Sequence, residues 1–127
     1  MIADSEIEGL VIALLAVSRF SVSRARLLLP ALRAAGLTSP KVVTGLDLGE
    51  LTVALARTGY DRGLLTSLYA KRLQTFMQGV LDGELDAPIE CLARNDRDTF
   101  LRLIRAVYGV GPSVAVNAWA ILTGVAK

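Results

Sequence analysis

Apolar residues recur every three to four positions along most of the chain, which is the spacing of an amphipathic α-helix. In the first such segment, residues 6–17, the apolar positions are Ile7, Leu10, Val11, Leu14 and Leu15. Strict alternation of apolar and polar residues, the pattern of a half-buried strand, does not extend over any useful length. The pattern therefore predicts an all-α protein.

Capping residues indicate where the helices begin and end. Ser21 or Ser23 is expected to cap a second helix that ends at Gly36, with a bend or break at Pro30. The other expected starts are at Ser39-Pro40, Asp47, Asp61, Ala87-Pro88, either Asp96 or Asp98, and Pro112. Because the connections between these segments are short, one compact multi-helix domain is expected over residues 1–127.

The longest predicted helix covers residues 61–81, between an N-cap at Asp61 and the turn Asp82-Gly83. Its apolar positions are Leu64, Leu65, Leu68, Leu73, Phe76, Met77 and Val80. All of them are expected to face the core.

Composition restricts the chemistry that the chain can perform. The chain is 53% apolar and 20% charged, and its 127 residues are enough to bury a core without a disulfide or metal, so disorder is excluded. The chain contains no histidine, which excludes a Ser-His-Asp triad and a histidine-ligated metal. Cys91 is the one cysteine and is expected to pack as a small apolar residue.

An uncharged stretch of 21 residues, 106–126, is long enough to suggest a membrane span. Gly109, Gly111 and Pro112 interrupt it, and such residues end a helix rather than continue it. Two helices joined by a tight turn are therefore expected, with no membrane association and with a cytoplasmic location as the default.

The Gly-Val-Gly turn is typical of a phosphate-binding hairpin. Gly109 and Gly111 permit positive φ and let a ligand approach the backbone, while Val110 is expected to anchor the turn in the core. The amides of Ser113 and Val114, at the start of the next helix, would face an anion. Such a site binds phosphate without reading a base. The alternative is an ordinary helix–helix corner with glycines for close packing.

Basic residues are grouped, although the net charge is only +2. One run comprises Arg19, Arg24, Arg26, Arg33 and Lys41, a second Arg57, Arg62, Lys71 and Arg72, and a third Arg94, Arg97, Arg102 and Arg105. If Arg102 and Arg105 face the same way as the turn, they would complete a phosphate site. The alternative is that these arginines only solvate scattered helix faces. Tyr108 adjoins the turn and is expected mainly to pack.

Residues 107–115, Val-Tyr-Gly-Val-Gly-Pro-Ser-Val-Ala, resemble the helix-hairpin-helix motif of DNA repair proteins. Residues 10–25 resemble the opening helices of the endonuclease III-type DNA glycosylase domain, and residues 56–73 resemble its Gly-Tyr/Phe-x-Arg-x-Lys-Ala helix start. The resemblance implies a glycosylase-like fold with its helix-hairpin-helix at about residues 98–123, and DNA as partner. It also implies a monovalent cation, Na⁺ or K⁺, on the backbone carbonyls of Arg105, Val107 and Val110, and no other cofactor.

Two departures from that family bear on catalysis. Ser113 stands where strand-cleaving members have a lysine, and a hydroxyl cannot form an imine. The family's catalytic aspartate follows the helix after the hairpin, whereas this sequence ends at Lys127. The expectation is therefore a sequence-independent DNA-binding domain that is not catalytic alone. A divergent or split glycosylase completed by another chain, and a protein-interaction module that kept the fold, are the alternatives.

The last predicted helix is strongly apolar, and in the family it is covered by further chain. Its large apolar residues are Val114, Val116, Trp119, Ile121 and Leu122. They are expected to be partly uncovered and to favour a homodimer or a partner protein.

Overall fold

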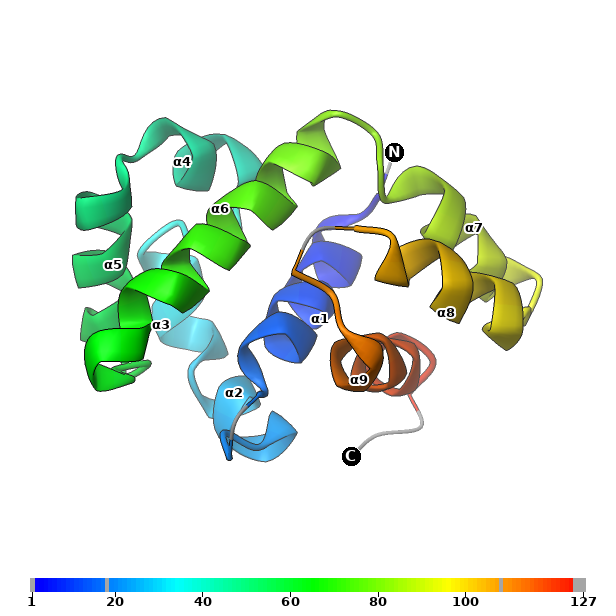
Figure 1. Ribbon diagram of the computed structural model, residues 1–127, viewed down its shortest axis with the longest axis horizontal. Helices are drawn as coiled ribbons and strands as arrows, with labels where there is room; N and C mark the ends of the chain where they lie inside the picture. Colours follow the sequence, from blue (N-terminus) through cyan, green and yellow to red (C-terminus); the bar gives the residue numbers. More distant parts are fainter. Residues whose placement is uncertain (1, 18, 108, 125–127) are drawn as a thin grey trace.

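The computed structural model describes residues 2–17, 19–107 and 109–124. Every regular element in these ranges is helical, which confirms the all-α prediction (Figure 1). The helices are α1 (Asp4–Leu15), α2 (Val22–Leu27), α3 (Leu29–Ala34), α4 (Pro40–Gly45), α5 (Leu48–Arg57), the 3-10 helix η1 (Gly63–Leu65), α6 (Thr66–Leu81), α7 (Asp86–Ala93), α8 (Arg97–Arg105) and α9 (Pro112–Leu122).

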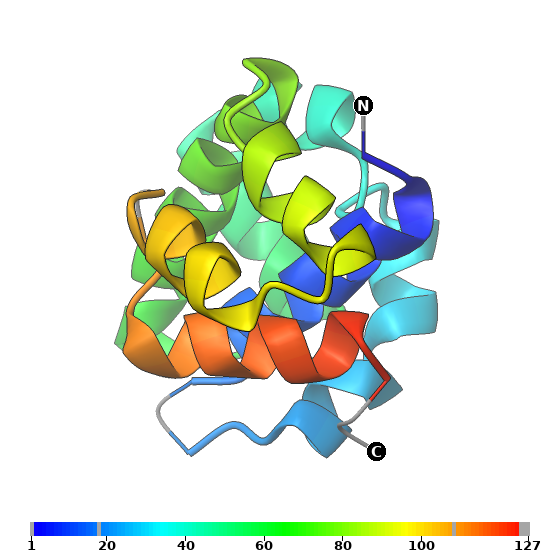
Figure 2. The same cartoon turned by 90° about the vertical axis from the view of Figure 1, so that its right-hand side faces the viewer.

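Helix α1 forms the centre of the core. Residues around most of its circumference are buried, as expected for a helix with neighbours on several sides. Figures 1 and 2 place α9 alongside it. A Cβ atom added at Gly9 would lie 2.9 Å from Cδ2 of Leu122, so the glycine lets α9 approach α1 closely. Ala16 and Val17, which follow α1, lie beside the connection between α8 and α9 that is described below.

Four helices begin at predicted capping residues. Ser21 accepts a hydrogen bond from the Arg24 amide, and Ser39, Asp47 and Asp96 cap α4, α5 and α8 in the same way. The expected break near Pro30 falls at Leu28, between α2 and α3. Gly36, at φ +78°, follows the end of α3 as predicted.

The prediction of one helix starting at Asp61 is wrong. Helix α6 begins at Thr66, because Gly63 adopts φ +63° and interrupts the helical path. The Asp61 carboxylate accepts a hydrogen bond from the Gly63 amide at 3.0 Å and closes a local turn instead of capping a helix. Leu64 is consequently fully exposed, and Leu65 and Leu68 are also exposed rather than in the core.

The remaining predicted apolar positions of α6 do face inward. Leu73, Phe76 and Met77 are buried, and Val80 is half-buried. Because Tyr69 and Ala70 are also buried, the apolar stripe of α6 begins at Tyr69, five residues after the predicted start at Leu64.

Helix α9 is better covered than expected. Val114 and Trp119 are buried, and the Trp119 ring lies 5.3 Å from the ring of Phe100 on α8. The expectation that these two side chains are uncovered is wrong, because α1 and α8 both pack on α9 (Figure 2). Val116 is exposed, and Ile121 and Leu122 are half-buried.

No helix within the described ranges has the length and apolar character needed to cross a bilayer. The described part of the uncharged stretch begins just after α8 and is divided between a turn and α9, as the glycines and proline predict.

Candidate functional site

The connection between α8 and α9, which we call the α8–α9 turn, comprises residues 106–111, of which Tyr108 lies outside the described residues. The Val107 amide donates to the Ile104 carbonyl at 3.0 Å, and the Val110 amide donates to the Val107 carbonyl at 3.2 Å. Both valine side chains are buried. The prediction that Val110 anchors the turn in the core is therefore confirmed.

The two glycines of the turn have different conformations. Gly109 adopts φ +84°, and a Cβ atom there would lie 3.5 Å from Cβ and Cγ of Arg72. Gly111 adopts φ −89°, which any residue can adopt, so this glycine does not use the positive φ that it permits. A Cβ atom at Gly111 would meet nothing within 4 Å. Gly111 therefore leaves open space in front of α9.

The N-terminus of α9 is exposed at Gly111, Pro112 and Ser113. No side chain caps it, and the Ala115 amide makes the first intrahelical bond, 3.0 Å to the Gly111 carbonyl. The amides of Ser113 and Val114 precede that bond and have no intrahelical acceptor, and Pro112 has no N–H. Together with the helix dipole, these two amides give this end of α9 a partial positive charge.

A hollow of about 650 Å³, which we call the turn hollow, opens at this end of α9. Its lining comprises Ala16, Val17, Arg19, Phe20, Arg72 and residues 109–114. None of these residues is acidic, and Arg19 and Arg72 are basic. The structure thus brings two arginines from distant parts of the sequence to the start of α9.

Arg102 and Arg105, the arginines expected at the turn, do not line the turn hollow. They line a separate depression on α8 together with Asp98, Leu101 and Ala106. The sequence pattern groups Arg19 and Arg72 only within basic runs. It carries no signal for their position at the turn, because that position depends on how α1, α6 and α9 pack.

The backbone beside the turn hollow is fixed by a buried polar cluster. The Tyr60 hydroxyl donates to the Leu15 carbonyl at 2.7 Å, and the Arg62 guanidinium donates to the Val17 carbonyl at 3.0 Å and to the Tyr60 hydroxyl at 3.1 Å. Burial raises the pKa of Tyr60 to about 12, against the effect of the nearby Arg62 charge. Tyr60 therefore remains a hydrogen-bond donor at neutral pH.

The arginines of the turn hollow have no acidic partner among the described residues. Arg72 lies over the Tyr69 ring at 5.5 Å, and Arg19 is exposed, with a backbone φ of +73°. Neither forms an ion pair with a described acidic residue, unlike Arg33, which pairs with Glu8. Their positive charge is therefore available to a ligand.

The donors available for a metal are backbone carbonyls. Within the described ranges, no three Asp, Glu or Cys side chains gather to bind a metal ion. The carbonyl of Arg105 lies at the C-terminal end of α8, where carbonyls lack intrahelical partners, and Val107 follows two residues later. The Val107 carbonyl accepts from Val110 and keeps a second lone pair. Neutral oxygens of this kind are compatible with the predicted Na⁺ or K⁺.

Cys91 is buried in α7, as predicted. Its sulfur lies 3.5 Å from the Ala87 carbonyl and 3.3 Å from Nη2 of Arg94.

No family model, curated protein or solved structure matches the chain.

Proposed function

We propose that the chain is a DNA-binding domain that holds the phosphate backbone of a strand at the α8–α9 turn without reading base sequence. We further propose that this turn is a helix-hairpin-helix motif on a glycosylase-like fold, as the resemblance of residues 107–115 implies. One observation carries the proposal: the uncapped N-terminus of α9 opens into the same hollow as two arginines that have no acidic partner among the described residues.

Each part of the turn hollow suits a phosphodiester. The amides of Ser113 and Val114 can donate to one unesterified oxygen, and the helix dipole favours its negative charge. Arg19 and Arg72 can donate to the other oxygens. The open space at Gly111 lets the backbone of a strand approach. None of these donors addresses a base edge, so the affinity depends on backbone contacts.

A cation would strengthen this site. The backbone carbonyls of Arg105, Val107 and Val110 would hold a Na⁺ or K⁺ ion, which adds positive charge beside the phosphate. The matching test compares DNA affinity in sodium, potassium and tetramethylammonium chloride at equal ionic strength.

The decisive test places a side chain in front of α9 without disturbing the fold. Gly111→Leu suits this purpose because its Cβ atom meets no neighbour and its φ is ordinary. Gly45→Leu is the matched control, since a Cβ atom at Gly45 also meets nothing within 4 Å. Fluorescence anisotropy with labelled duplexes of two unrelated sequences measures binding.

We expect the unsubstituted chain to bind both duplexes with similar affinity, and to bind more weakly as salt rises. Gly111→Leu should weaken binding at least about tenfold, which corresponds to about 1.4 kcal/mol. Gly45→Leu should bind like the unsubstituted chain. Absence of binding at low salt, or equal affinities for the two variants, would overturn the proposal.

Self-association through α9 is a secondary proposal. The exposed large apolar side chain of α9 is Val116, while Ile121 and Leu122 are half-buried beside α1. Stable interfaces bury about 1,200–2,000 Å² in total, so neighbouring elements would have to contribute to a dimer. Sedimentation velocity over a hundredfold concentration range tests this, with Val116→Lys as the variant expected to remain monomeric.

A further inference from the structure

A second hollow adjoins the turn hollow. It has a volume of about 260 Å³ and is lined by Arg19, Phe20, Arg24, Gly59, Asp61 and Arg62. Arg19 and Phe20 line both hollows. The two hollows are therefore neighbours on one surface, with Arg19 between them. We call the second one the α2 hollow, because Arg24 belongs to α2.

Aromatic rings hold the guanidinium groups of the α2 hollow in place. The Arg24 guanidinium lies 4.4 Å from the centre of the Phe20 ring, and the Arg62 guanidinium lies 5.5 Å from the same ring. Arg62 also lies 5.1 Å from the Tyr69 ring, on which Arg72 of the turn hollow stacks. Alternating rings and guanidinium groups thus connect the two hollows. For Arg24, such stacking orients the guanidinium group and leaves its edge donors available to a ligand.

The charge balance of this surface favours an anionic ligand. Arg19 and Arg24 form no ion pair with a described acidic residue. Asp61 is the acidic residue that lines the α2 hollow, and its carboxylate accepts a hydrogen bond from the Gly63 amide. Three arginines therefore face one carboxylate in this hollow, and a bound anion lowers the repulsion among these cations. Arg19 also adopts a left-handed conformation, which a side-chain-bearing residue adopts at an energetic cost.

We propose that the α2 hollow binds a second phosphate, adjacent to the phosphate in the turn hollow and on the same DNA strand. Arg24 holds this second phosphate, the charge of Arg62 lies beside it in the same hollow, and Arg19 bridges the two. The inference rests on the proposed DNA binding and defines the path of the strand, from the start of α9 across Phe20 towards α2. Phe20 is almost fully buried, so it supports the arginines and offers no face on which a base could stack.

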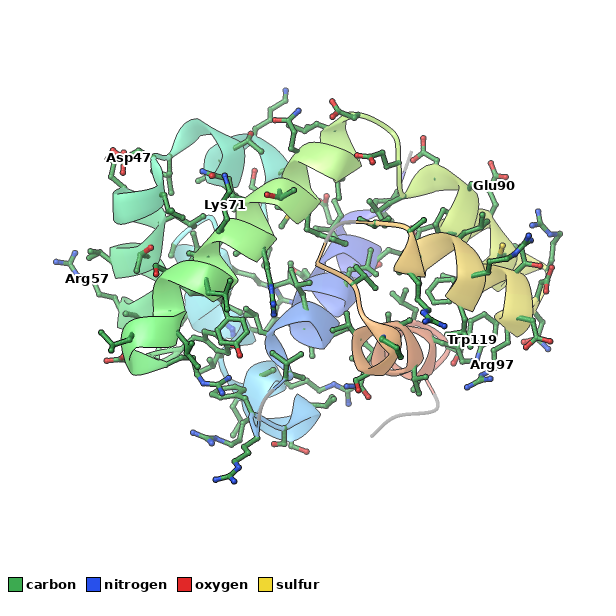
Figure 3. All side chains as sticks on the ribbon, viewed as in Figure 1. Asp47, Arg57, Lys71, Glu90, Arg97 and Trp119 are labelled. Carbon is green, nitrogen blue, oxygen red and sulfur yellow. The ribbon has the colours of Figure 1, made fainter. Side chains whose placement is uncertain are left out.

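The test uses two variants that each remove one positive charge. Arg24→Gln changes the α2 hollow, and because its backbone amide is unchanged it keeps the hydrogen bond to Ser21 that caps α2. Arg97→Gln is the matched control, since Arg97 is exposed at the start of α8, at the opposite end of that helix from the turn (Figure 3). Duplex affinity is measured by anisotropy across a salt series for the unsubstituted chain and both variants.

We expect Arg24→Gln to reduce the slope of log affinity against log salt by about 0.9, the value for one phosphate contact. Arg97→Gln should leave the slope unchanged. Arg24→Lys keeps the charge and should restore most of the slope, which separates loss of a phosphate contact from loss of the stacking on Phe20. Thermal melts of all variants confirm that they are folded.

The possible failures are distinguishable. If the unsubstituted chain binds no DNA, the proposed function and this inference both fail. If Gly111→Leu weakens binding but Arg24→Gln behaves like Arg97→Gln, the turn site stands and the second phosphate site is overturned. A parallel assay uses vesicles of phosphatidylserine and phosphatidylcholine, because the exposed Leu64 is two residues from Arg62 in the sequence. If Arg24→Gln reduces vesicle binding while the DNA salt slope is unchanged, the patch binds lipid headgroups and the inference is overturned.

Discussion

The hydroxyl of Tyr60 donates a 2.7 Å hydrogen bond to the backbone carbonyl of Leu15, 45 positions earlier in the chain. Leu15 is the last residue of α1, and Ala16 and Val17, which follow it, line the turn hollow. Tyr60 is fully buried and contacts Phe20 edge-on, with the ring centres 4.7 Å apart. One side chain therefore links the core to the position of the candidate site.

Replacing Tyr60 with phenylalanine should destabilise the protein by about 1–3 kcal/mol, because the buried Leu15 carbonyl loses its donor. Urea denaturation followed by circular dichroism measures this loss. The Arg62 guanidinium also loses its bond to the hydroxyl, so the backbone beside the turn hollow should loosen and DNA affinity should fall modestly.

The same variant reveals a pH dependence. Burial raises the pKa of Tyr60 to about 12, whereas an unfolded tyrosine titrates near 10. The unfolded chain therefore loses this proton first, and the stabilisation is complete below pH 10 and declines as the pH rises towards 12. The difference in unfolding free energy between the unsubstituted chain and Tyr60→Phe should be constant from pH 7 to 9 and shrink above pH 10. A difference that stays constant up to pH 12 would contradict this assignment.

Glu8 and Arg33 should produce the opposite pH dependence. Two guanidinium nitrogens of Arg33 donate to the Glu8 carboxylate at 2.6 and 2.7 Å, and these hydrogen bonds lower the pKa of Glu8. The pair therefore stabilises the fold above the ordinary pKa of glutamate, and the effect is lost as the pH falls through the lowered value. Because Arg33 is largely exposed, we expect a small, salt-sensitive effect.

The measurement compares the unsubstituted chain with Glu8→Gln by urea denaturation at several pH values. The difference in unfolding free energy should be present at pH 7, vanish at strongly acidic pH, and shrink in 1 M salt. An undiminished difference at acidic pH would indicate that Glu8 contributes through packing instead.

Gly9 determines how closely α9 approaches α1. A Cβ atom at this position would lie 2.9 Å from Cδ2 of Leu122 and 3.3 Å from Cγ2 of Ile121. Gly9→Ala should be nearly neutral, because the helix-propensity gain of up to about 1 kcal/mol offsets a small shift of the Leu122 side chain. Gly9→Ile should destabilise the fold by about 1–3 kcal/mol through overpacking.

Thermal and urea denaturation measure both Gly9 variants. The double variant Gly9→Ile with Leu122→Ala provides the control, since removing the Leu122 branch should recover part of the loss. No recovery in the double variant would mean that the crowding lies elsewhere.

Features determined by neighbouring residues could be predicted from the sequence, and features determined by packing could not. Asp47 and Glu50, three residues apart, form a capping box at the start of α5, so residues close in the sequence determine where that helix begins. Leu64 and Leu65 match a helical stripe, but the left-handed Gly63 just before them changes the direction of the chain. The spacing of apolar residues in the sequence does not reveal the φ value of a single glycine.

The candidate site also has some features that sequence neighbours determine and others that packing determines. The turn and the exposed start of α9 follow from the residues Gly-Val-Gly-Pro-Ser, which are contiguous. The identity of the arginines beside it depends on which helices meet there. Arg102 and Arg105 are close to the turn in the sequence but project elsewhere, whereas Arg19 and Arg72 reach it because α1 and α6 pack in the core.

The two glycines of the turn should respond differently to alanine. Gly109→Ala places a side chain in a left-handed conformation, which costs about 1–2 kcal/mol, and its Cβ atom would contact Arg72. Gly111→Ala keeps an ordinary φ, and its Cβ atom meets nothing within 4 Å. Alanine caps a helix less well than glycine, but it also lowers the entropy of the unfolded chain, and these two effects oppose each other. The free energy of unfolding should therefore change by less than about 0.5 kcal/mol.

Urea denaturation of the two alanine variants distinguishes a glycine that the backbone conformation requires from a glycine that leaves room for a ligand. Gly109→Ala should lose stability, and its DNA affinity should fall only as far as the turn is displaced. Gly111→Ala should keep its stability and lose less affinity than Gly111→Leu, because a methyl group obstructs the start of α9 less than an isobutyl group. If Gly111→Ala instead unfolds as easily as Gly109→Ala, Gly111 is required by the fold, and its open surface cannot be read as the approach path of a phosphate.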